Sequence, residues 1–168
     1  MKKFWLIMAT LAVALSGAAG CTAPAPGVSN FNLIFKYGVG AKNELSTFED
    51  TYTKDMVNEP SITVNLSLTE EELDRIYQKM VEIDFFAYPD KFSVSVSPGE
   101  SVGMVTPYNS YYFRVQYDSK IKELWWEDKI INEDKKAKKL RELIQLITDI
   151  IRAKEEYKKL PEPTSGYL

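Results

Sequence analysis

The pattern of residues 62–83 predicts a half-buried strand that is followed directly by a capped helix. This strand–helix junction restricts the folds that the chain can adopt. Between residues 62 and 68, apolar and polar residues alternate, which is typical of a strand with one buried face. Thr69 and Glu72 then have the spacing of a capping box, which indicates the start of a helix. The helix is expected to end before Pro89, and its apolar stripe consists of Leu73, Ile76, Tyr77, Met80 and Ile83.

Other segments of the chain also have the character of strands. We expect these strands at 31–37, at two short segments between 45 and 56, at 92–96, and in a hairpin of 111–117 with 121–127. A loop rich in Pro, Gly and Ser is expected from 97 to 110. The segment Gly38 to Lys42 lacks the spacing of a phosphate-binding loop and is predicted to be a turn.

A second amphipathic helix is predicted from about Glu133 to Ala153. Its apolar face consists of Leu140, Leu143, Ile144, Ile147, Ile150 and Ile151. Strands joined as hairpins, together with two helices that each need a surface to cover, indicate a layered α+β fold. We therefore expect an antiparallel sheet of about five to six strands, covered on one face by two helices.

The first 20 residues have the three parts of a secretory signal peptide. Lys2 and Lys3 precede an apolar run over 4–15, and small residues follow over 16–20. A membrane-spanning helix needs about 20 apolar residues, and a stretch rich in proline begins too early for that. A cleaved signal is therefore favoured over a retained transmembrane helix.

The stretch Ala18-Ala19-Gly20-Cys21 resembles the lipobox of bacterial lipoproteins. The resemblance implies that Cys21 becomes the first residue of the mature chain and carries two or three acyl chains, such as palmitate, that hold it to a membrane outside the cytoplasm. The family usually has leucine where this chain has Ala18, so ordinary signal cleavage with a free Cys21 thiol is the alternative. Residues 21–30 are then a flexible tether, and residues 31–168 a single domain.

Composition excludes several kinds of chemistry. The chain has no histidine, which rules out Ser-His-Asp and Cys-His catalysis and the usual zinc sites that contain histidine. Its formal charge of −3 becomes −5 without Lys2 and Lys3, and a mildly acidic domain without a long basic patch is a poor candidate for nucleic acid. We expect no metal and no cofactor.

Aromatic residues form the first candidate binding surface, because exposed aromatic rings can stack on sugar rings. The residues concerned are Tyr108, Tyr111, Tyr112, Trp125 and Trp126. Adjacent residues of a strand point to opposite faces, so at most one of the two tryptophans is expected to be exposed. Packing in the core is the alternative for these residues.

Acidic residues and lysines form two further candidate sites. Two carboxylates can act as acid and base in glycoside cleavage, with a solvated loop as the alternative, and the acids concerned are Glu44, Glu49, Asp50, Asp55 and Glu59. Four lysines at the start of the second helix indicate either contact with anionic lipid or wall polymer, or a solvated helix face. They are Lys135, Lys136, Lys138 and Lys139.

Together these features predict a membrane-anchored, extracytoplasmic lipoprotein whose body is a non-enzymatic binding or accessory protein of the cell envelope. Its partner is either a glycan or another envelope protein. Two alternatives stay open: a carboxylate-dependent hydrolase of cell-wall glycans, and an inhibitor that binds protein.

Overall fold

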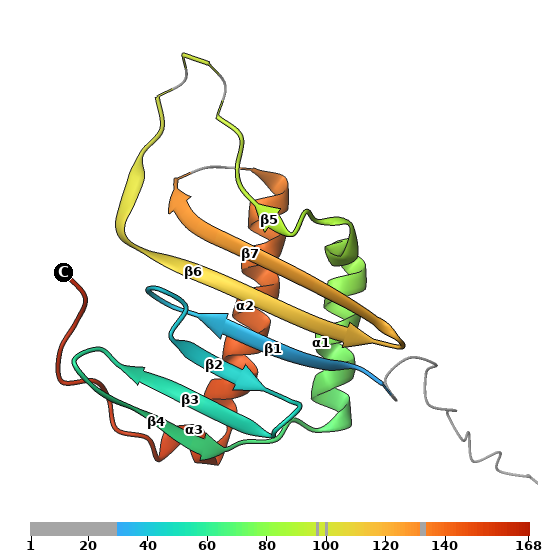
Figure 1. The fold of residues 1–168 in the computed structure, drawn as a ribbon, viewed down its shortest axis with the longest axis vertical. Coiled ribbons are helices and arrows are strands. Elements are labelled where there is room, and N and C mark those ends of the chain that lie inside the picture. The colour runs from blue at the N-terminus through green and yellow to red at the C-terminus, as the bar shows by residue number, and fades with distance from the viewer. Residues whose placement is uncertain (1–29, 97, 100, 132–133) are drawn as a thin grey trace, which may run out of the picture.

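The computed structural model describes residues 30–96, 98–99, 101–131 and 134–168, and Figure 1 shows their arrangement. The expected signal peptide, the lipobox and Cys21 lie outside the described residues. The described part is an α+β fold in which two main helices lie on one face of a single sheet (Figure 1). The expected fold class is confirmed at this level.

Seven strands of the described residues form the sheet, in the order β4-β3-β2-β1-β6-β7-β5. All neighbours are antiparallel except β5 and β7, which are parallel. The expectation of a purely antiparallel sheet of five to six strands is therefore wrong in both respects. The strands are β1 (Asn32–Tyr37), β2 (Asn43–Ser46), β3 (Thr51–Met56), β4 (Glu59–Asn65), β5 (Lys91–Phe92), β6 (Met104–Tyr117) and β7 (Lys120–Ile130).

The parallel pair follows from the path of the chain. After β5 the chain passes beyond β7 to reach β6, and a hairpin then returns it as β7, so that β7 runs in the same direction as β5. The alternation over 92–96 predicts a longer strand than the one observed. Pairing is confined to Lys91 with Trp125 and Phe92 with Trp126, because the chain then departs from β7.

Helices α1 (Glu70–Glu82) and α2 (Lys135–Ala153) pack on the sheet, and the short helices η1 (Phe85–Ala87) and α3 (Glu155–Lys158) follow them in the chain. The apolar stripe of α2 is buried as expected. Helix α2 begins two residues later than predicted, because Asp134 is its N-cap and accepts a 2.8 Å hydrogen bond from the Ala137 amide. The largest fully buried side chains include Trp126, Tyr52, Phe35, Phe85 and Phe113.

The capping box at the start of α1 is confirmed. The Glu72 amide donates to Thr69 Oγ1 over 3.2 Å, and the Thr69 amide donates to Glu72 Oε2 over 2.8 Å. Both bonds satisfy amides that a helix start leaves without intrahelical partners. The local sequence alone is therefore sufficient to fix where this helix begins.

Two strand boundaries differ from the sequence prediction. Strand β6 begins at Met104, inside the segment expected to be a loop, and its pairing with β7 is irregular between Met104 and Asn109. Strand β4 begins at Glu59 and includes Pro60. Proline is tolerated there because β4 is the edge strand of the sheet and its pairing with β3 is irregular between Lys54 and Met56, and proline within sheets is confined to edge strands and bulges.

The C-terminal segment 161–168 returns to the sheet beside β3. Lys54 Nζ donates to the Pro161 carbonyl and to Glu162, and the Tyr167 hydroxyl donates to Asp55. The segment is thus attached to β3 at both of its ends. Within the part of the chain that the structure describes, no helix is both long enough and apolar enough to cross a bilayer.

Candidate functional site

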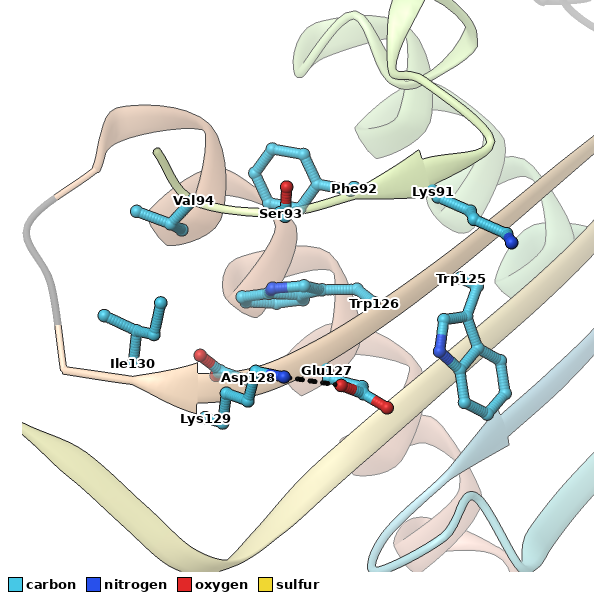
Figure 2. A pocket seen from close by; sticks show the side chains of 10 residues that line it. All are labelled: Lys91, Phe92, Ser93, Val94, Trp125, Trp126, Glu127, Asp128, Lys129 and Ile130. Carbon is cyan, nitrogen blue, oxygen red and sulfur yellow. Dashed lines mark hydrogen bonds and ion pairs between the residues drawn. The ribbon is translucent and has the colours of Figure 1, made fainter. Parts of the chain in front are cut away.

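A groove of about 480 Å³ runs along the end of β7, at the point where β5 stops (Figure 2). Two segments line it, 91–94 and 125–130. Six consecutive residues of β7 contribute, and successive side chains of a strand point to opposite faces. The groove therefore lies along the edge of the sheet and takes side chains from both faces.

The helix-facing wall of the groove is apolar. Phe92 lies with its ring edge-on to Trp126, with 5.5 Å between the ring centroids and 65° between the ring planes. Val94 and Ile130 continue this wall (Figure 2). Phe92 and Trp126 belong to the hydrophobic core, so this wall is a direct extension of the core to the surface.

The opposite wall carries the charged groups. Lys129 Nζ lies 3.0 Å from Glu127 Oε2, and this hydrogen bond raises the pKa of Lys129. Lys91 is exposed, and no ion pair joins it to another described residue. The groove therefore has one cation without a neutralising partner among the described residues.

Asp128 also lines the groove, but it is neutralised from the helix layer. Arg141 of α2 donates to its two carboxylate oxygens over 2.8 and 2.6 Å, which is the bidentate geometry preferred by guanidinium and carboxylate. The same guanidinium lies 5.3 Å from the centroid of the Trp126 ring. Arg141 therefore holds both the strand end and the apolar wall in place.

The five aromatic residues predicted as a binding surface are divided between the two faces of the sheet. Trp126 is 1% exposed and Tyr111 is 8% exposed, whereas Trp125 is 37% exposed. The prediction that at most one of Trp125 and Trp126 is exposed is therefore confirmed. Burial raises the pKa of Tyr111 above its ordinary value, as expected for a phenol in the core.

On the open face, Trp125 lies directly opposite Tyr112 of β6. Their ring centroids are 6.4 Å apart and the ring planes are inclined by 48°. Tyr108 lies near the same edge, with Lys129 Nζ 5.9 Å from its ring centroid. The open face thus presents separate rings at an angle to one another, and Trp125 is the one that also lines the groove.

None of the five acids proposed for glycoside cleavage lines the groove. Glu44 forms a 2.9 Å ion pair with Lys36 across β1 and β2, while Asp55 and Glu59 accept hydrogen bonds from the C-terminal segment. Glu49 and Asp50 lie in the turn between β2 and β3. Among the described residues, no group of acids has the arrangement of a metal site.

The remaining sequence candidates are on the surface. All four lysines at the start of α2 are exposed, and Lys136 Nζ lies 5.9 Å from the ring centroid of Tyr88. The segment Gly38 to Lys42 is a turn, as predicted, closed by a 3.0 Å hydrogen bond from the Ala41 amide to the Gly38 carbonyl. Neither feature contributes a side chain to the groove.

The sequence predicts Trp125 and Trp126 as candidate binding residues, but it does not predict the groove that they line. Its second wall comes from residues 91–94, and they meet β7 through the parallel pairing of β5, whose residues pair with positions 34 further along the chain. The sequence offers one usable signal. The strand expected at 92–96 is shorter than the second hairpin strand expected at 121–127, so it could pair with only part of that strand.

No protein-family model, no curated protein and no solved structure matches this chain. A groove with one apolar and one charged wall suits a ligand that is itself apolar on one side and polar on the other.

Proposed function

We propose that this protein is a membrane-anchored, extracytoplasmic lipoprotein and that its body is a non-enzymatic binding or accessory protein of the cell envelope. The signal-like segment and Cys21 support the anchoring. The groove beside β7 supports the binding role, and it is the observation that carries the proposal. Its volume lies within the range of about 300 to 1,000 Å³ that is usual for ligand sites.

The groove is better suited to binding than to carboxylate catalysis. A glycosidase needs two carboxyl groups that face each other across the scissile bond. The two acids of the groove, Glu127 and Asp128, are neighbours in β7 and so project to opposite faces. Each also has its own cation, Lys129 for the first and Arg141 for the second.

Metabolic labelling tests the anchoring part of this proposal. Bacteria that express the full chain are grown with radiolabelled palmitate, and the Cys21→Ser variant is the matched control. We expect label on the wild-type protein, in the membrane fraction, and none on the variant. An intact mass that corresponds to an unmodified thiol, or to a chain that still begins at Met1, would overturn it.

Incubation with purified wall glycan separates binding from hydrolysis. We expect the full chain, purified in detergent, to release no reducing ends from the glycan. If the wild type releases reducing ends and the Glu127→Gln variant does not, the protein is a hydrolase and the proposed binding role is wrong. Release that persists in this variant would also overturn the binding role, and it would place the active residues elsewhere.

A further inference from the structure

We infer that the free edge of β4 is an interface at which two copies of this chain join their sheets. In this arrangement the β4 strands of the two copies pair in antiparallel fashion about Thr63. The inference rests on the backbone of β4 and is independent of the groove, which lies at the other end of the sheet.

The backbone of β4 has a defined set of groups that face outward. The Leu66 amide donates to the Asp50 carbonyl over 2.7 Å, and the adjacent register pair is Thr51 with Asn65. In an antiparallel ladder this places Asn65 at a non-hydrogen-bonded position. Positions then alternate, so the amide and carbonyl groups of Ser61, Thr63 and Asn65 point away from β3.

Within the described part of the chain, no strand covers these outward groups. Strand β4 is the last in the sheet order, and the side chains of Ser61, Thr63 and Asn65 are exposed. Natural proteins usually protect such an edge with charged residues, proline or a bulge. Here Glu59, Pro60 and a register shift beside Lys54 protect only the first part of the strand.

The rest of the edge carries no charge at all. Every residue from Pro60 to Thr69 is uncharged, so no lysine or acid opposes the approach of a second strand. A second copy brings the same uncharged segment. With the twofold axis at Thr63, the only charged residue of β4, Glu59, falls opposite Ser67 of the partner and meets no like charge.

The sequence of β4 fits a copy of itself. Residues 61–65 read Ser-Ile-Thr-Val-Asn, which is nearly palindromic in chemical type about its central threonine. Antiparallel pairing about this position sets each β-branched aliphatic residue against another on the helix side, and threonine against threonine on the open face. Both kinds of cross-strand pair stabilise sheets.

The backbone pattern also provides a selective test. Thr63 and Thr53 form a non-hydrogen-bonded pair, with their hydroxyls 2.8 Å apart, so the Thr63 amide takes no part in the ladder with β3. The Thr63→Pro variant therefore removes an interface donor and leaves the β3–β4 ladder intact. Thr63→Val keeps the amide and is the matched control.

Molecular mass in solution is the measurement. The full chain, in a large excess of detergent micelles, is followed by sedimentation over a range of protein concentrations. We expect a dimer for the wild type and for Thr63→Val, and an at least about tenfold weaker dimer for Thr63→Pro and for Thr63→Lys, which sets two cations face to face. A single cooperative thermal unfolding transition in each variant would show that the variants are folded.

Hydrogen exchange tests the same interface without any variant. The amides of Ser61, Thr63 and Asn65 are expected to exchange more slowly as the protein concentration rises, while those of Ile62 and Val64 stay protected throughout by β3. A wild type that is monomeric at every concentration, or a dimer that Thr63→Pro does not weaken, would overturn the inference.

Discussion

Lys54 and Glu162 are 108 residues apart in the sequence, yet Lys54 Nζ lies 2.9 Å from Glu162 Oε1. The same ammonium donates to the Pro161 carbonyl over 2.9 Å and lies 5.1 Å from the ring centroid of Tyr157. The Lys54 side chain is 5% exposed, whereas that of Glu162 is 81% exposed. The contact thus joins a buried lysine to an exposed acid at the C-terminal segment.

This asymmetry predicts unequal effects of substitution. Lys54→Ala leaves the Pro161 carbonyl without its donor and removes a buried side chain, so we expect a loss of about 2 kcal/mol in the free energy of unfolding. Glu162→Gln removes only an exposed charge, and under about 1 kcal/mol is expected. Urea denaturation measures both. Equal losses would show that the ion pair, and not the buried lysine, holds the segment.

The start of α1 gives a second prediction. Thr69→Ala removes one half of the capping box, and we expect a loss of about 1 kcal/mol in unfolding free energy. Glu72 also accepts a 2.5 Å hydrogen bond from Lys154, at the end of α2. Glu72→Gln keeps an oxygen for the Thr69 amide and should therefore destabilise less than Glu72→Ala. Urea denaturation of the three variants is the check, and the reverse order for the two Glu72 variants would contradict this account of the cap.

Tyr52, which is buried, and Tyr37, which is half-buried, make stability depend on pH in the alkaline range. Tyr37 and Tyr52 share a 2.7 Å hydrogen bond between their hydroxyls, and burial raises the pKa of each above the ordinary value for tyrosine. Their neutral forms are favoured in the folded state, so the stability they contribute is fully present below pH 10 and is lost as the pH rises above it.

The Tyr52→Phe variant isolates this contribution. It removes one proton from the difference between the folded and unfolded states, so above pH 10 the free energy of unfolding should fall less steeply, by up to about 1.4 kcal/mol per pH unit. Near neutral pH the same variant should be less stable by about 1 kcal/mol, because the hydroxyl pair is lost. Urea denaturation at a series of pH values measures the slope, and an unchanged slope would count against a buried neutral Tyr52.

The consecutive residues Trp125 and Trp126 test which face of the sheet is buried and which is exposed. Trp126→Ala should cost about 3 to 5 kcal/mol of unfolding free energy, because it opens a large cavity under α2. Trp125→Ala should cost far less, under about 1 kcal/mol, since its ring lies partly in solvent. Denaturant unfolding of the two variants compares them directly, and similar losses would contradict the assignment of faces.

Local signals in the sequence were sufficient for much of the fold. The capping box at Thr69 and the alternation around Leu33 and Phe113 each depend on neighbours along the chain, and all three are found as predicted. Such patterns report which face of an element is buried. They do not report which distant element covers that face.

The features that could not be predicted from the sequence depend on pairing between segments that are distant in the chain. Strand β5 is two residues long, and the residues with which it pairs are 34 positions further along the chain, so no local periodicity records the pairing. The early part of β6 was expected to be a loop because the segment 97–110 is rich in Pro, Gly and Ser, although β6 begins at Met104. The groove depends on the pairing of β5 with β7, which explains why only its tryptophans were identified from the sequence.

Photo-crosslinking in the native envelope tests the proposed binding groove most directly. A photoreactive amino acid replaces the exposed Ser93 at the groove in one full-length protein, and Val81, which is 51% exposed on α1, in another. The account predicts a discrete adduct from position 93 that weakens in the Trp125→Ala background, and none from position 81. Adducts of equal yield from both positions, or none from position 93, would contradict it.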